Sequence, residues 1–232
     1  MVYFYRMEKL FKEYGLDIDE NKKNLFKSYY SLLLEYNSRF NITAITDERE
    51  VVIKHFIDSA LGVELLKGET LADVGSGGGF PAIPLKILKP ELKVTLIEAT
   101  EKKCEFLKTV ADTLGLKEVT VLCGRAEEFA KKSEYREKFD ICTARAVARL
   151  NILSEYCLPF VKKGGIFLAY KGDADEEARD SENAVKILGG KIITHDKYVL
   201  DGAKRSLIVI EKQKNTDAKY PRGNARIKNK PL

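Results

Sequence analysis

Apolar residues recur at helical spacing near the start of the chain. In residues 19–40 they fall three or four positions apart, which places them on one face of a helix. Asp47, with Glu50 three positions later, is typical of a capping box and predicts a second helix that runs through residues 49–66. The Asn- and Thr-rich segment 41–46 indicates a turn between the two helices.

From residue 70 the pattern changes to short apolar runs that alternate with helical segments. Such strands are typical of a parallel sheet covered on both faces, with right-handed crossovers. The last two strands, residues 191–200 and 206–213, are joined only by DGAKR, which is too short for a crossover helix, so they must pair antiparallel. The pattern predicts an α/β fold with a doubly wound, mostly parallel sheet and a C-terminal antiparallel hairpin. The expected parallel strands are residues 70–74, 93–99, 119–124, 139–144 and 165–171.

Length and charge suggest how the chain is organised. A chain of 232 residues favours one domain with additions. Residues 212–232 contain seven Lys or Arg and one Asp, so they carry a net +6, whereas the rest of the chain carries −1. A basic chain end commonly binds nucleic acid through electrostatic attraction. The alternative is an end that is solvated and disordered. We expect a helical cap at 1–67, a core at 68–213 and a basic tail at 214–232.

Composition bears on the compartment. No stretch approaches the ~18 apolar residues of a membrane span, and the N-terminus lacks the pattern of a signal peptide. The four cysteines are widely spaced and form no C-x-x-C, which argues against a disulfide framework or a metal site and for a reducing compartment. We interpret them as small buried apolar residues. The expectation is a cytoplasmic monomer without a membrane partner or a bound metal.

A glycine cluster follows the first predicted strand in LADVGSGGGFPAIPLKI, residues 71–87. A dinucleotide fingerprint needs a third glycine where Phe80 stands, and the Gly-Lys-Ser/Thr of a P-loop does not occur. Asp73 would repel a pyrophosphate, at a cost on the order of 1–4 kcal/mol, but would attract an ammonium or a sulfonium. The loop therefore favours a cationic, phosphate-free ligand such as S-adenosylmethionine, and Gly75 and Gly77 would let it approach the backbone.

Acidic residues stand at the ends of the next two predicted strands. Glu98 ends the second strand, 25 residues after Asp73, where a carboxylate accepts hydrogen bonds from both ribose hydroxyls of an adenosine. Thr100 is expected to cap the helix that follows. Ala126 and Glu127 come after the third strand and are expected to meet the adenine edge. Together with the glycines, these residues predict an adenosine-containing cofactor.

These segments, with FNITAIT, KHFIDSA, TARAVARL and the tail YPR…KNKPL, resemble the RsmG (glucose-inhibited division protein B, GidB) family over nearly the whole chain. The resemblance implies a class I methyltransferase that methylates N7 of a guanine in 16S rRNA, with the rRNA or the small ribosomal subunit as its partner. Two positions depart from the family pattern: Ala82 replaces a usual glycine, and the tail has GNARIK in place of a Gly-x-Pro motif. The cofactor contacts that the resemblance implies fall on Gly75, Phe80, Glu98, Ala99, Thr100, Ala126, Glu127 and Arg145.

Guanine N7 already carries a lone pair, so its methylation needs no proton removed, and alignment alone can supply ~7–11 kcal/mol. We therefore expect no catalytic general base. Cys142 lacks the Pro-Cys setting of enzymes that methylate C5 of pyrimidines. TARA stands where methyltransferases of exocyclic amines usually have an Asn/Asp-Pro-Pro-aromatic motif. The expected RNA-binding residues are Arg149, Lys171, Arg222, Lys228 and Lys230.

Several alternatives stay open at this point. A methyltransferase could act on tRNA, a protein or a small molecule, because one fold hosts many functions. A non-catalytic RNA-binding protein is disfavoured by the intact Asp73, Glu98 and glycine loop, and a nucleotide-dependent oxidoreductase by Phe80 and Asp73. Arg145 is expected to meet the cofactor carboxylate or a phosphate, with a structural ion pair as the alternative. His55 lies either near the site or under the N-terminal helices.

Overall fold

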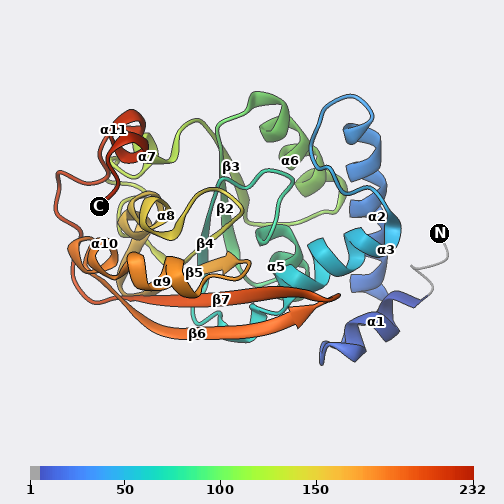
Figure 1. Cartoon of the computed structure of the whole chain (residues 1–232). Coiled ribbons are helices and arrows are strands. Elements are labelled where there is room, and N and C mark those ends of the chain that lie inside the picture. Colours follow the sequence, from blue (N-terminus) through green and yellow to red (C-terminus); the bar gives the residue numbers. More distant parts are fainter. Residues whose placement is uncertain (1–5) are drawn as a thin grey trace.

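The structure, a computed structural model, describes residues 6–232 (Figure 1). Within this part of the chain the strands are β1 (Thr70–Val74), β2 (Lys93–Glu98), β3 (Val119–Cys123), β4 (Phe139–Arg145), β5 (Val161–Lys171), β6 (Gly190–Leu200) and β7 (Ala203–Lys212). They form one sheet in the order β3-β2-β1-β4-β5-β7-β6. β1 to β5 run parallel, whereas β7 pairs antiparallel with both β5 and β6. The predicted doubly wound sheet with a C-terminal hairpin is confirmed.

One face of the sheet is covered by the N-terminal helices and two helices of the α/β part (Figure 1). These elements are α1 (Met7–Glu13), α2 (Glu20–Asn37), α3 (Glu48–Val51), the π-helix η2 (Val52–Ile57), α4 (Asp58–Ala60), the 3-10 turn η3 (Val63–Leu65), α5 (Ala82–Leu88) and α6 (Glu101–Thr113). α2 buries Tyr29 and Leu33, which belong to the predicted apolar face, and also Phe26, which the prediction did not include. The N-terminal helices therefore share one core with the sheet.

The other face of the sheet is covered by shorter helices, including one from the basic tail (Figure 1). These elements are α7 (Ala126–Phe129), α8 (Leu150–Cys157), the 3-10 turn η4 (Leu158–Phe160), α9 (Asp175–Asp180), α10 (Glu182–Ile187) and α11 (Asn224–Asn229). α11 packs on α8, and its Ile227 is fully buried. The alternative of a solvated, disordered tail is wrong, because the tail contributes apolar side chains to this core.

Local signals account for the start of α2 and α3, each of which has an Asp side chain as its N-cap. Asp47 caps α3 by accepting a hydrogen bond from the backbone N of Glu50 (3.0 Å), as predicted, but the Glu50 side chain pairs with Lys54 instead of completing the capping box. The predicted helix does continue from there, but it passes through η2, and such π segments are frequent at functional sites. β5 begins at Val161, four residues before the predicted start, because Val161 pairs with Phe139 of β4 ahead of an irregularity in the register.

The cysteines divide into two groups. Cys104, Cys142 and Cys157 are buried, in agreement with their interpretation as small core residues. Cys123 is exposed at the end of the edge strand β3, so the same interpretation is wrong for it. Among residues 6–232, no group of side chains has the composition of a metal site, and no helix is long and apolar enough to cross a bilayer.

Candidate functional site

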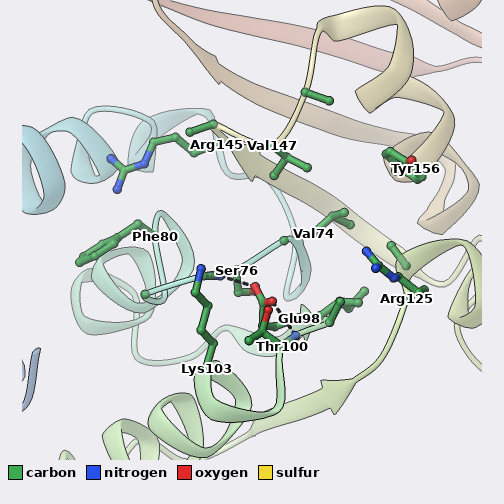
Figure 2. A pocket seen from close by; sticks show the side chains of 18 of the residues that line it. Val74, Ser76, Phe80, Glu98, Thr100, Lys103, Arg125, Arg145, Val147 and Tyr156 are labelled. Atoms are coloured by element: carbon green, nitrogen blue, oxygen red, sulfur yellow. Dashed lines mark hydrogen bonds between the residues drawn. The ribbon is translucent and has the colours of Figure 1, made fainter. Parts of the chain in front are cut away.

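A cavity of about 460 Å³ opens at the carboxyl ends of the central strands, where the strand order reverses between β1 and β4 (Figure 2). This is where open α/β sheets bind their ligands, and the volume is typical of a small-molecule site. Nearly all the predicted cofactor residues line it: Gly75, Gly77, Phe80, Glu98, Ala99, Thr100, Ala126, Glu127 and Arg145. The structure therefore brings together residues that are up to 70 positions apart in the chain.

The glycine loop forms the floor of this cavity. Gly75 and Gly77 have positive φ values of 71° and 55°, a conformation that favours glycine. A Cβ built on Gly75 would lie 2.6 Å from a methyl of Val147, whereas at Gly77 the nearest atom would be a backbone oxygen at 3.8 Å. Glycine is therefore needed at Gly75 because the Val147 side chain approaches closely, and at Gly77 because of the backbone conformation.

Glu98 holds the loop and faces the cavity at the same time (Figure 2). Its Oε2 accepts a hydrogen bond from the backbone N of Gly77 (2.9 Å), and its Oε1 accepts one from the backbone N of Thr100 (2.8 Å). Because each carboxylate oxygen has two acceptor sites, both oxygens keep one for a ligand. This arrangement fits the two ribose hydroxyls of an adenosine. Thr100 occupies the N-cap position of α6, but its hydroxyl forms no capping bond, contrary to the prediction.

Asp73 lies beneath the loop instead of in the cavity. It is fully buried and does not line the cavity, which contradicts the expectation of direct contact with the ligand. Asp73 and Thr143 are register partners of β1 and β4, and the Thr143 hydroxyl donates to Asp73 Oδ1 (2.7 Å). Oδ2 has no partner among the described residues, and burial raises the pKa of Asp73 to about 6. The Asp73 side chain thus joins β1 to β4 directly before the loop.

His55 and Phe80 form an aromatic wall at one end of the cavity. Their ring centroids are 4.4 Å apart with an interplanar angle of 19°, and the Arg145 guanidinium lies 5.1 Å from the Phe80 centroid. Burial and the neighbouring charge of Arg145 lower the pKa of His55 to about 3, so the ring is neutral at neutral pH. Of the two readings of His55, the structure supports the one near the site.

Thr43 completes this wall, although its sequence context had indicated only a turn residue. His55 Nε2 lies within hydrogen-bond distance of Thr43 Oγ1 (2.9 Å), and Arg145 Nη2 lies 3.5 Å from His55 Nδ1. Thr43 Oγ1 also accepts a hydrogen bond from the backbone N of Ile45 (3.1 Å). Thr43, which lines the cavity as well, therefore ties the His55 ring to the turn that precedes α3.

Arg145 is both a wall residue and a member of an ion pair. Its Nη1 lies 2.8 Å from Oδ2 of Asp58, and both side chains are nearly buried, 12% and 5% exposed. Asp58 Oδ1 accepts a further hydrogen bond from the Tyr198 hydroxyl (2.9 Å) and lies 3.7 Å from Arg205 Nε. The structural ion pair expected as the alternative for Arg145 is present, at the edge of the cavity.

A second cavity of about 330 Å³ lies on the far side of this ion pair. It shares His55, Arg145 and Ala146 with the first cavity. Its remaining wall carries three basic side chains around the single carboxylate of Asp58, from Lys54, Lys171 and Arg205. The two cavities therefore meet at Arg145, one lined by the glycine loop and the other by cations.

The five expected RNA-binding residues do not form one free surface. Arg222 pairs with the buried Glu155, and Lys171 pairs with Glu177 (2.6 Å), each of the two basic side chains being little exposed. Arg149 is exposed and pairs with Asp180. Lys228 lines the first cavity, and Lys230 is exposed. The charges of Arg222 and Lys171 are thus used within the protein.

Known proteins resemble this chain closely. The family model of the rRNA small subunit methyltransferase G, GidB, matches residues 22–207. The ribosomal RNA small subunit methyltransferase G of Lactobacillus acidophilus is 46% identical over 228 residues, 95% of both chains. The protein of that name from Pediococcus pentosaceus is 48% identical over 224 residues, 93% of this chain and 92% of its own.

Solved structures resemble this one in fold. Cofactor-bound Rv0187 from MTB superposes with a TM-score of 0.59 at 15% identity, covering 81% of this chain and 91% of that one. Pyrococcus horikoshii TYW2 in complex with MeSAdo gives 0.55 at 15% identity, covering 67% and 61%. The fold is that of the S-adenosylmethionine-dependent methyltransferases, and the chain belongs to the rRNA small subunit methyltransferase G (GidB) family.

Proposed function

We propose that this protein transfers the methyl group of S-adenosylmethionine to N7 of a guanine in the 16S rRNA of the small ribosomal subunit. The proposal is supported by family membership over most of the chain. The structural observation that carries it is Glu98, whose carboxylate is tied to two backbone N–H groups and still offers an acceptor site on each oxygen to the cavity.

The residues present fit the cofactor. Glu98 would hold the ribose hydroxyls, Gly75 and Gly77 would let the amino acid part approach the backbone, and Ala126 and Glu127 would meet the adenine edge. When bound, S-adenosylmethionine supplies an electrophilic methyl group on a sulfonium. The lining residues extend from Phe80 and Arg145 past Glu98 to Arg125 and Tyr156 (Figure 2), so the cofactor would lie along this line with its ribose at Glu98.

The acceptor base is proposed to enter from the second cavity. That cavity opens beside Arg145 and His55, and its basic wall suits the phosphates that flank a nucleotide in RNA. Lys54 and Arg205 are the cations expected there. Each has a carboxylate partner, Glu50 and Asp58, as Lys171 has Glu177, but their side chains are 28% exposed, against 11% for Lys171. Lys230 and Arg149 would contact more distant phosphates of the RNA. We propose a monomer that acts in the cytoplasm on 16S rRNA or on the small subunit.

The chemistry of the site agrees with a reaction that needs no base. His55 is the side chain best placed to take a proton at the aromatic wall, but its pKa of about 3 leaves it a very weak base. Guanine N7 attacks with an existing lone pair, so a neutral, weakly basic wall does not hinder the reaction. The expected contribution of the protein is alignment of N7 with the methyl carbon and sulfur.

The test is transfer of labelled methyl from S-adenosylmethionine to 16S rRNA and to small subunits, both from a strain without the enzyme. Transfer RNA serves as the control substrate. Label recovered as 7-methylguanine from the rRNA is the expected result, and the preparation that accepts it shows the required assembly state. Label found only in tRNA, or absent from every RNA while the cofactor binds, would overturn the substrate assignment.

A further inference from the structure

The C-terminal segment, residues 214–232, forms part of the wall of the first cavity. Asn224 and Lys228, four positions apart on α11, both line it, together with Arg125 and Tyr156. In Figure 1, α11 lies beside α7 and α8, the helices that flank the third and fourth strands. The sequence had indicated only a basic handle here, and none of the cofactor contacts implied by the family resemblance falls in this segment.

The segment is fixed to the core by its backbone. Arg136, which follows α7, donates from Nη1 to the backbone O of Tyr220 (2.8 Å) and from Nη2 to the backbone O of Thr216 (2.7 Å). The Thr216 hydroxyl donates in turn to the backbone O of Leu188 (2.7 Å). Arg136 Nη2 also donates to the backbone O of Asp217 (3.2 Å), so one guanidinium binds three carbonyl groups of the segment and orders the chain before α11 begins.

The segment is fixed a second time by an ion pair directly before α11. Arg222 donates from Nε to Glu155 Oε1 (2.8 Å) and from Nη2 to Oε2 (2.6 Å), and its backbone N donates to Oε1 (2.8 Å). The Glu155 side chain is 1% exposed and that of Arg222 is 12% exposed. Such a bidentate, desolvated pair specifies geometry, and here it sets the place where α11 starts.

Asn224 is thereby presented to the cavity with its amide oriented. The Tyr156 hydroxyl donates to Asn224 Oδ1 (2.6 Å), so the amide oxygen is used and the NH₂ group remains as a donor. No acceptor for that NH₂ group is found among the described residues. Tyr156 and Arg125 lie at the end of the cavity away from Phe80 and Arg145 (Figure 2), beyond the ribose position marked by Glu98.

We propose that Asn224 binds the adenine of the cofactor by donating from its amide to a ring nitrogen, and that Glu155, Arg222 and Tyr156 are positioning residues that hold it there. The proposal rests on the proposed function for the identity of the cofactor. Adenine carries acceptor nitrogens on its ring edges, whereas a carboxylate or sulfonium belongs at the other end of the cavity. The C-terminal segment is therefore part of the cofactor site as well as a candidate contact for RNA.

The first experiment measures the affinity of the full-length protein for S-adenosylhomocysteine by calorimetry. Asn224→Ala is expected to weaken binding about 3- to 10-fold, as for one uncharged hydrogen bond. Asn224→Asp keeps the acceptor for Tyr156 but removes the donor and is expected to lose at least as much. Asn229→Ala is the matched control, because Asn229 is exposed on the same helix and does not line the cavity. Melting of the ligand-free variants checks that each is folded.

The second experiment separates contact from structural support. The 1-, 3- and 7-deaza analogues of S-adenosylhomocysteine each lack one ring acceptor. If Asn224 contacts the adenine, Asn224→Ala loses little further affinity for one of them, so the two changes are not additive. Glu155→Gln, which acts by positioning Asn224, is expected to weaken binding of S-adenosylhomocysteine and to lose little further affinity for that same analogue, whereas an equal loss for all the ligands would show that Glu155 only supports the fold.

The outcomes separate this inference from the assignment of the cofactor. If the wild type binds S-adenosylhomocysteine and Asn224→Ala binds it equally well, the inference alone is overturned. The same holds if Asn224→Ala loses affinity equally for all three deaza analogues. If the wild type binds neither S-adenosylhomocysteine nor S-adenosylmethionine, both the inference and the proposed function fail.

Discussion

Asp58 and Arg145 form a nearly buried ion pair, 2.8 Å between Oδ2 and Nη1, in the wall that separates the two cavities. Asp58 comes from the N-terminal helical segment and Arg145 from the end of β4. Tyr198 of the C-terminal hairpin donates to the same carboxylate. Three parts of the chain thus converge on one acid, and the position of Arg145 beside both cavities depends on it.

Asp58→Asn is expected to destabilise the protein by about 3–5 kcal/mol, because the Arg145 charge would stay buried without its partner. The free energy of unfolding in urea measures this effect. Asp180→Asn is the matched control: it breaks the pair with Arg149, whose side chains are 63% and 67% exposed, and an exposed pair contributes only ~0–1 kcal/mol. Equal losses of unfolding free energy in the two variants would show that the Asp58–Arg145 pair stabilises the protein no more than an exposed pair.

Glu98→Ala is expected to weaken S-adenosylmethionine binding by ~1–3 kcal/mol, through the loss of charge-assisted hydrogen bonds to the ribose and of the carboxylate that holds Gly77. Calorimetry gives the change directly. Glu101→Ala, on the exposed first turn of α6, removes an acid three positions away and is expected to bind normally. Unchanged affinity in Glu98→Ala would remove this residue from the site.

The elements that the sequence predicted well are those with a local signal. β1 has the predicted bounds, and α3 starts directly after Asp47, the predicted N-cap. Glu98 was found because it ends a strand, and parallel strands end at the same edge of the sheet. Strand alternation also explains the error at Asp73: the side chain follows the register with Thr143 and turns away from the cavity.

The parts that the sequence did not predict depend on contacts between distant segments. Glu155 and Arg222 are 67 positions apart. In the sequence alone, Glu155 looks like an exposed residue of a helix and Arg222 like one of several basic residues in the tail. The same is true of Asp58 with Arg145, 87 positions apart. No periodicity or motif marks such pairs. Only the structure shows that the charge of Arg222, which was expected to bind RNA, is paired with Glu155 inside the protein.

Acid is expected to destabilise the protein through His55. Its pKa of about 3 in the folded protein lies below the ordinary 6.5, so its contribution to stability is fully present above pH 6.5 and is lost as the pH falls toward 3. The full loss is roughly 5 kcal/mol. His55→Gln cannot take up this proton, so its unfolding free energy should fall less steeply between pH 6.5 and 4. Parallel curves for the two proteins would contradict the assignment.

Asp73 is expected to affect the unfolding free energy in the opposite direction to His55, stabilising the protein as the pH falls from about 6 to 4. Its folded pKa of about 6 lies above the ordinary 3.8, so the folded state favours the protonated acid, and the associated stability is present below pH 3.8 and lost as the pH rises through 6. Above pH 6 the buried carboxylate costs roughly 3 kcal/mol. Asp73→Asn keeps the oxygen that accepts from Thr143 and cannot ionise.

The stability difference between wild type and Asp73→Asn should therefore change with pH, with the wild type gaining relative to the variant as the pH falls from 7 to 4. Urea unfolding at several pH values measures this difference. Thr143→Val provides an independent check, because removing the hydroxyl that stabilises the carboxylate should move the transition to higher pH. A difference that stays constant from pH 4 to 7 would mean that Asp73 has an ordinary pKa, and that the floor of the glycine loop is hydrated.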